Sequence, residues 1–273
     1  MACLTAGCIP SSVQEVLLIS KTRLLTLVKN LKWEEVAQGL AENPALLRFR
    51  DERGRNWLHL ACAVKIKERR IPPSESIKTA DVLLNAGLDV NQAAFHEPDF
   101  KATPLWYAIA HGQNLKLAEF LLRRGSVPHY CMWAAAYNDD AAAIRLLVAN
   151  GAGINPIAED ATPFLFAIQW SRFAAAEQLL KLGADVNVQN SRKMTALHYL
   201  LKKGSDKKYV RMLIQYGARG DLRDASGASA AEIMSRKKDP DFRKMSSQIL
   251  AAKRRYDKRT ETTAKSWECL FTN

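Results

Sequence analysis

The chain has 273 residues, of which 48% are hydrophobic and 25% are charged, and its formal net charge at pH 7 is +12. This apolar content excludes a disordered chain, which carries far fewer Leu, Ile, Val and Phe residues. The excess of positive charge leaves an acidic partner protein, a nucleic acid or an anionic surface as candidate partners.

The cysteines indicate a reducing compartment. Their total is five, they are scattered at irregular spacing, and none forms a C-x-x-C pair. This usage favours reduced thiols, so we expect the protein in the cytoplasm. Cys62 lies in an Ala-rich stretch and is expected to be a small buried hydrophobic residue. Lys21 and Arg23 interrupt the apolar stretch near the N-terminus, so no membrane span is expected.

Three regions are predicted along the chain. Residues 1–30 form a partly helical extension, residues 31–255 form a repeat domain, and residues 256–273 form a basic, flexible tail. Within the repeat domain, the stretch from Trp33 to Leu40 is expected to be a helix that covers one open end of the array. End units of a repeat array usually have atypical sequences because one of their faces meets water.

The repeat domain is recognised by helices that end in glycine. Two similar stretches, D-V-L-L-N-A-G-L-D-V-N at 81–91 and E-Q-L-L-K-L-G-A-D-V-N at 177–187, illustrate the pattern. Glycine closes such helices because it tolerates a positive φ angle. The recurrence of such glycine-terminated helices along the chain is typical of a solenoid. The five closing glycines are Gly87, Gly125, Gly151, Gly183 and Gly217.

The start of each unit carries a second pattern, in which a Thr opens a stretch rich in Ala and Leu. Thr-Ala-Leu-His at 195–198 and Thr-Pro-Leu-Trp at 103–106 are clear copies, and Asn-Trp-Leu-His at 56–59 is a degraded one. Together with Gly-Ala-Asp-Val-Asn at 183–187, these motifs resemble the ankyrin repeat over roughly residues 31 to 255. The resemblance implies an all-α solenoid of about five repeats plus capping helices, each repeat being a β-turn finger followed by two antiparallel helices.

The resemblance also gives roles to recurring residues. It implies that His59 and His198 hydrogen-bond locally and to the neighbouring unit, so we interpret them as structural and not catalytic. Asn91 and Asn187 are assigned to the scaffold for the same reason, because this Asn bridges the turn in many members of the family.

Two units depart from the regular spacing. Gly125 lies only 4 steps before the next opening position, whereas Gly183 lies 12 steps before Thr195, so the finger after Gly125 is predicted to be truncated. About ten extra residues lie between residues 65 and 76. Because Pro72 and Pro73 cannot continue a helix, we predict a basic loop between two helices there.

No catalytic motif is present. The chain lacks a phosphate-binding loop, a dinucleotide-binding glycine motif, H-E-x-x-H and G-x-S-x-G, and its five histidines show no metal-ligand spacing. Because the repeats occupy nearly the whole folded chain, we predict a non-catalytic protein that holds no cofactor and no metal.

The resemblance places partner binding on the concave side of the array, where finger tips and the ends of the first helices meet. Tyr137 and Trp170 are amphipathic aromatics of the kind that anchor interfaces. The alternative is that both pack under neighbouring side chains. The predicted partner-binding residues are His111, Tyr137, Gln169, Trp170, Lys202 and Lys203 on the helices, and Arg53, Arg55, Phe100, Arg192 and Met194 on the fingers.

The basic C-terminus supports a competing interpretation. Residues 236–273 contain 11 Lys and Arg against 5 Asp and Glu. Such a segment binds nucleic acid or an anionic surface by neutralising phosphates, or it is simply a solvated helix face. We favour a monomer that binds an unidentified, acidic partner protein, with nucleic-acid binding as the alternative.

Overall fold

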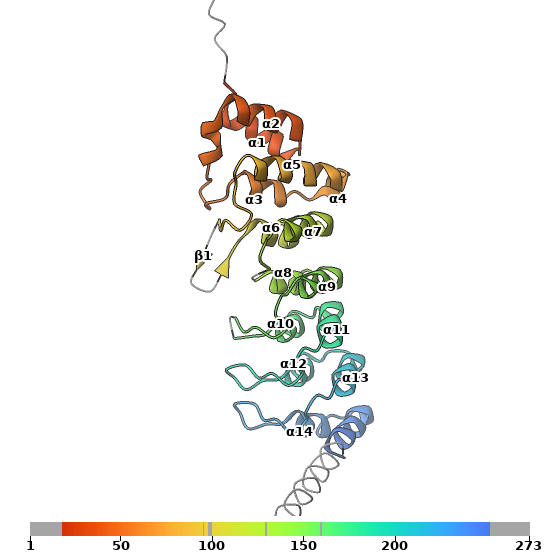
Figure 1. The fold of residues 1–273 in the computed structure, drawn as a ribbon. Coiled ribbons are helices and arrows are strands. Elements are labelled where there is room, and N and C mark those ends of the chain that lie inside the picture. The colour runs from red at the N-terminus through yellow and green to blue at the C-terminus, as the bar shows by residue number, and fades with distance from the viewer. Residues whose placement is uncertain (1–17, 95, 98–99, 129, 159, 252–273) are drawn as a thin grey trace, which may run out of the picture.

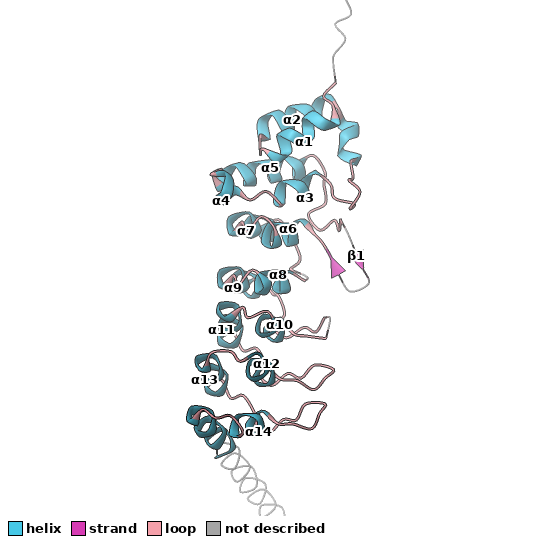
Figure 2. Ribbon diagram, turned by 180° about the vertical axis from the view of Figure 1, so that it is seen from behind, coloured by secondary structure: helices cyan, strands magenta, loops and turns pink. Residues whose placement is uncertain are grey.

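The computed structural model of the chain describes residues 18–251, except residues 95, 98–99, 129 and 159. These residues form a single stack of antiparallel helix pairs from which loops project on one side (Figure 1). Seen from behind, the same two columns of helices run the length of the molecule (Figure 2). The architecture is the mostly helical solenoid that the sequence predicts.

One helix of each pair lies next to the projecting loops and forms the inner column, and the other helix forms the outer column (Figure 1). The inner helices are α1 (Lys21–Lys29), α3 (Trp57–Cys62), α6 (Pro104–Ala110), α8 (Cys131–Tyr137), α10 (Pro163–Gln169), α12 (Ala196–Lys203) and α14 (Ala230–Ser235). The outer helices are α2 (Trp33–Glu42), α5 (Pro73–Asn85), α7 (Leu115–Arg123), α9 (Ala141–Ala149), α11 (Phe173–Lys181) and α13 (Lys207–Gln215), followed by a helix whose described part covers residues 240–251.

Each inner helix contacts the inner helices before and after it, and the outer helices from α2 to α11 do the same. Their apolar faces form one continuous core, which extends from Leu24 in α1 to Ile249 near the end of the described chain. Small residues allow this close stacking: Ala108, Ala135 and Ala167, on successive inner helices, are completely buried. The array therefore has no separate core for each unit.

Local signals start and stop the helices. The hydroxyls of Thr103 and Thr162 accept hydrogen bonds from backbone N–H groups three residues ahead, and Pro fills the first helical position after each. Gly183 closes α11 with φ +93°, and a Cβ there would meet no atom within 4 Å. Glycine is therefore required at this position by backbone conformation and not by lack of space.

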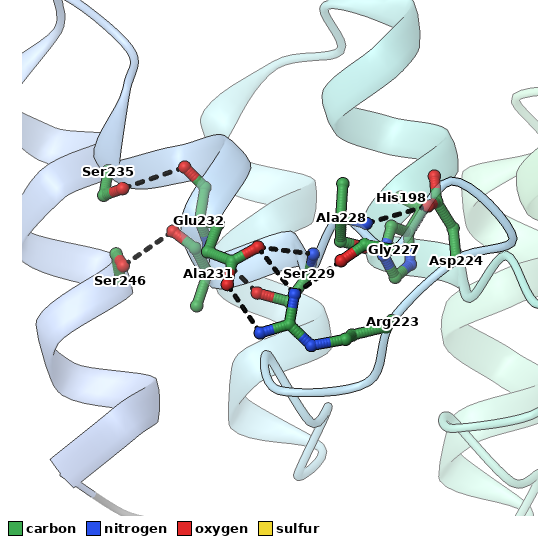
Figure 3. A network of polar contacts seen from close by, with 10 residues as sticks. All are labelled: His198, Arg223, Asp224, Gly227, Ala228, Ser229, Ala231, Glu232, Ser235 and Ser246. Atoms are coloured by element: carbon green, nitrogen blue, oxygen red, sulfur yellow. Dashed lines mark hydrogen bonds and ion pairs between the residues drawn. The ribbon is translucent and has the colours of Figure 1, made fainter.

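Polar side chains connect successive units, as the resemblance implies. Nε2 of His59 lies 2.9 Å from the carbonyl oxygen of Gln92, and Nε2 of His198 lies 3.1 Å from that of Ala228 (Figure 3). Asn187 donates to the carbonyl of Gly217 at 3.2 Å and accepts from the next unit's backbone at 2.7 Å. The structural interpretation of both histidines is confirmed, because each satisfies a carbonyl of the following finger.

The last unit is fastened by a compact polar network (Figure 3). Arg223 in the final finger donates to Glu232 of α14 at 2.7 Å, and Ser229 caps the same helix through its hydroxyl. Ser246, in the helix of residues 240–251, donates to the carbonyl of Ala231 at 2.8 Å. These contacts orient the closing helix pair at the end of the stack.

Three fingers share one turn chemistry. In the first, a carboxylate oxygen of Asp51 accepts the N–H groups of Arg53 and Arg55 at 3.0 and 2.9 Å. In two later fingers Asn190 accepts the N–H of Met194, and Asp224 accepts that of Ala228, also four residues ahead. An Asx side chain that satisfies its own turn makes the finger rigid without any core of its own.

The segment between α3 and α5 differs from the predicted loop. It contains a four-residue helix, α4 (Ile66–Arg69), which is followed by Arg70 in a left-handed conformation with φ +54°. Pro73 then begins α5, because proline at the first turn of a helix removes only an N–H that has no partner there. Ile66 is buried, and its burial explains why this insertion is ordered as a helical turn.

Short additional elements complete the chain. A 3-10 helix, η1 (Pro44–Arg48), follows α2, and the long finger before α6 contains two paired strands, β1 (His96–Glu97) and β2 (Phe100–Lys101). The strands add a little β-structure to the all-helical prediction. The predicted tail at 256–273 lies outside the described residues.

The N-terminal helix belongs to the stack. In α1, Leu24 and Val28 are completely buried in the same core as Trp57 of α3. The common core thus begins within residues 1–30, which the sequence analysis predicts to be an extension outside the repeat domain. Of the cysteines, Cys62 is fully buried as predicted, and burial raises the pKa of its thiol far above the usual range.

We predict that Asn56→Thr stabilises the protein. Asn56 occupies the position that Thr195 has in a later unit, and its amide nitrogen is buried without a hydrogen-bond partner among the described residues. Threonine keeps the helix cap and removes that nitrogen, so the free energy of unfolding should rise by about 1 kcal/mol. Urea unfolding measures this free energy. The control, Asn56→Ala, removes the helix cap and should lose about 1 kcal/mol of stability. A threonine variant less stable than wild type contradicts the prediction.

We also predict that acid destabilises the protein through His59. Burial lowers the pKa of His59 from 6.5 to about 4 in the folded state. The unfolded chain therefore binds more protons between these values, so stability present above pH 6.5 is lost as the pH falls toward 4. Urea unfolding at pH 7.5 and pH 5 should show a loss of about 2 kcal/mol from this residue. The loss should be smaller in His59→Gln, and an equal loss in the variant rules out His59 as its source.

Candidate partner-binding surface

Three aromatic side chains meet on the inner helices in the middle of the stack. The ring centroid of Tyr137, at the end of α8, lies 5.7 Å from that of Trp170 and 6.5 Å from that of Phe166 on α10. Tyr137 is 47% exposed and Trp170 is 53% exposed, whereas Phe166 is half-buried. We call Tyr137, Phe166 and Trp170 the aromatic ridge. The alternative that neighbouring side chains cover Tyr137 and Trp170 does not fit these exposed fractions.

An arginine supports the ridge. The guanidinium of Arg172 lies 5.1 Å from the centroid of the Tyr137 ring, within the range of a cation–π contact. Its position is fixed by the turn between α10 and α11, where Ser171 has φ +57° and the N–H of Arg172 donates to the carbonyl of Ala167 at 2.8 Å. The tight turn therefore fixes the backbone from which Arg172 reaches the Tyr137 ring.

Polar residues flank the ridge on the side of α12. Gln169 donates to the hydroxyl of Tyr199 at 3.0 Å, and Asn190 of the adjacent finger donates to the same hydroxyl at 2.9 Å. The ammonium of Lys203 donates to the backbone carbonyl of Gln169 and lies 3.4 Å from the hydroxyl of Ser171. The structure thus brings together Gln169, Trp170 and Lys203 from the predicted set.

Another predicted group lies at the end of α6. The imidazole of His111 stacks on Tyr107 with a centroid distance of 5.4 Å, and Arg55 lies 5.9 Å from the Tyr107 ring. Asp51 holds Arg55 through an ion pair of 2.7 Å. Partial burial and the nearby positive charge of Arg55 lower the pKa of His111, which favours its neutral imidazole.

The remaining predicted residues are dispersed. Arg53 and Lys202 are exposed and lie apart from the ridge, whereas the exposed Arg192 lines a pocket together with Gln169 and Trp170. Met194 is only 5% exposed, so its prediction as a contact residue is wrong. Its backbone N–H donates to the side-chain oxygen of Asn190 at 2.9 Å and closes the turn. Phe100 lies in β2, and its side chain is outside the described part of the structure.

The sequence reasoning missed a pocket beside α8. The chain from 124 to 130 joins α7 to α8, whereas residues 150–162 join α9 to α10. Between these connections lies a pocket lined by uncharged residues, including Val127, Pro128, Met132, Trp133 and Ile157. It lies at the first turn of α8, while Tyr137 is the last residue of that helix. Trp133 therefore lines this pocket, and Tyr137 does not.

The described residues contain no group of three or more His, Cys, Asp or Glu side chains arranged to hold a metal ion. Across the same part of the chain, the helices are too short or too polar to cross a membrane. The described surface carries exposed aromatic side chains, Tyr137 and Trp170, and exposed basic ones such as Lys203.

Comparisons with known proteins identify the repeats. A family model described as ankyrin repeats, in 3 copies, matches residues 105–190 and also residues 131–224. Residues 105–224 of the chain are ankyrin repeats. Ankyrin repeats generally serve as protein-interaction modules, and they present extended concave surfaces.

Solved structures with the ankyrin fold agree with this assignment. The human ASB11 ankyrin repeat domain superposes with a TM-score of 0.62 at 23% identity, covering 77% of this chain and 90% of that domain. The ankyrin repeat domain of Bcl-3, a member of the IkappaB family, has a TM-score of 0.62 at 19% identity. The match covers 77% of this chain and 92% of that domain. At this level of identity the likeness shows the ankyrin fold alone.

Curated relatives match over a shorter range. Mouse inversin is 28% identical over 129 residues, which are 46% of this chain and 12% of inversin. Chicken inversin is 29% identical over 109 residues, which are 39% of this chain and 10% of inversin. The likeness therefore concerns a small part of inversin.

Proposed function

We propose that the chain binds a partner protein through the concave face of its ankyrin repeats, with the aromatic ridge as the anchor. The observation that carries this proposal is the exposure of Tyr137 and Trp170, at 47% and 53%, on neighbouring inner helices. Tyr and Trp are enriched among the residues that contribute most to binding, because each buries a large area and keeps a polar group for hydrogen bonding.

The surroundings of the ridge support an anchor role. Arg172 and the turn at Ser171 hold the rings in place, so little conformational freedom is lost when a partner covers them. Gln169 and Lys203 form a polar, positively charged border. A border of this kind favours a partner with acidic residues around an apolar contact and increases its rate of association.

The proposal extends to the protein's class, compartment and domain bounds. We take the protein to be a non-catalytic, monomeric binding module in the cytoplasm, a compartment that suits the free thiols of Cys62 and Cys131. We place the start of the repeat domain at α1, because Leu24 and Val28 are part of the common core. Nucleic-acid binding through the C-terminal segment has no support in the comparisons, and we do not propose it.

The decisive experiment replaces both exposed ridge residues. Tyr137→Ala with Trp170→Ala should weaken capture of the partner from a lysate of the source cells, and then its measured affinity, by at least about tenfold, since two anchors are lost. Quantitative mass spectrometry of the captured proteins identifies the partner, and titration of the purified partner measures Kd.

The matched control removes two exposed hydrophobic residues from the outer column. Leu115→Ala with Tyr216→Ala changes residues that are 36% and 37% exposed, and it should leave the affinity within about twofold. Urea unfolding of both variants verifies that the fold is intact. Full affinity in the ridge variant would exclude the aromatic ridge as the binding site.

A further inference from the structure

The insertion between α3 and α5 concentrates positive charge on one edge of the stack. Lys65, Lys67, Arg69 and Arg70 are all exposed on or beside α4. The Arg69 guanidinium donates to the carbonyl of Lys29 at the end of α1, at 2.8 Å, and so brings the exposed Lys29 into the same group. We call Lys29, Lys65, Lys67, Arg69 and Arg70 the basic edge.

The basic edge is separate from the aromatic ridge. The helix α4 projects on the side of the stack opposite the fingers (Figures 1 and 2). In the stacking order, the pair of α6 and α7 lies between the unit that carries α4 and the unit of α8. A ligand on the basic edge therefore does not need the aromatic ridge.

The charge of the basic edge is poorly balanced. Within residues 65–70 the only acid is Glu68, which pairs with Lys65 at 2.9 Å while both side chains remain more than half exposed. Such an exposed pair contributes little and is easily exchanged for another partner. Among the described residues, neither Lys67 nor Arg70 has an ion pair or a side-chain hydrogen bond. Glu34 and Glu35 lie in the first turn of α2, where they stabilise the helix N-terminus.

The backbone holds these cations in position. Arg69 is tied to the end of α1, and Ile66 anchors α4 in the core. Arg70 ends the helix with φ +54°, and its N–H donates to the carbonyl of Lys67 at 3.3 Å. The anchored turn therefore fixes the backbone positions from which these side chains project.

We propose that the basic edge docks an acidic segment of a partner protein. Arginine forks match carboxylates in pairs, and lysines add positive charge around them. No exposed aromatic or large aliphatic side chain lies in residues 63–72. A membrane surface site usually adds apolar groups that insert into the bilayer, and a single-stranded nucleic-acid site adds aromatics that stack on bases. A run of carboxylates needs neither feature.

The test measures binding of the full chain to a labelled peptide of six Glu-Gly units, with a peptide of six Gln-Gly units as the uncharged probe. Fluorescence anisotropy at about 50 mM salt is suitable, because exposed charges are only weakly screened there. The acidic peptide should bind and the uncharged one should not. Lys67→Gln with Arg70→Gln should raise Kd at least about fivefold, since two charge contacts are lost.

The control variant makes the same change in net charge elsewhere. Lys116→Gln with Arg123→Gln removes two cations of α7 that are 71% and 68% exposed, and Kd should change by less than about twofold. Equal weakening in both variants would mean that net charge alone attracts the peptide, which overturns the proposal. Equal binding of both peptides, or no binding of the acidic one, overturns it as well.

Two further probes distinguish the partner class. Vesicles of phosphatidylserine and phosphatidylcholine, and a polyuridine oligomer, are titrated against the same variants. If the vesicles and the oligomer both bind more weakly than the acidic peptide does, the proposal is supported. Tighter binding of either probe that depends on Lys67 and Arg70 assigns the basic edge to that surface and rejects a protein ligand. The midpoint of thermal unfolding should be the same for all variants, because the four replaced residues are exposed.

Discussion

Burial between neighbouring helix pairs is the interaction on which the whole molecule depends. A single pair cannot cover its own apolar faces, so each unit is stable only when the next unit packs on it. Residues such as Leu105 and Leu197 are buried by this stacking. Fingers and turns need no core of their own, and they hold their shape through Asx turns and through bridges such as that of His59 to Gln92. Variation in loops and exposed positions is therefore compatible with a constant scaffold.

The sequence predicted the stack well because its signals are local. Gly183 closes a helix through its own φ angle, and Thr162 opens one through its own hydroxyl. The exceptions depend on contacts distant in sequence. Packing of α1 on α3 is not visible in the spacing of the repeats, since α1 carries neither the Thr nor the Gly pattern. The helix α4 forms because Ile66 finds a place in the core, whereas the two prolines alone suggest a loop.

In the candidate site, too, local features were predicted from the sequence and contacts between distant residues were not. The resemblance placed Tyr137 and Trp170 near the ends of the first helices of their units, and both are exposed there in the structure. It did not indicate Phe166 or Arg172 as their neighbours, since these contacts depend on side-chain direction and on the turn at Ser171. Met194 was predicted as a contact residue because it lies on a finger, but the burial of a finger side chain depends on three-dimensional packing that the repeat pattern does not show.

The unit of α6 and α7, which lies between the aromatic ridge and the basic edge, has a mechanical consequence. A solenoid bends by small rotations that add up from one unit to the next. A partner that held Tyr137 at one point and Arg70 at another would span this unit and brace it against bending. Its two contacts would also strengthen each other, because binding at one raises the local concentration at the other. The curvature of the free array would then determine which partners reach both points without strain.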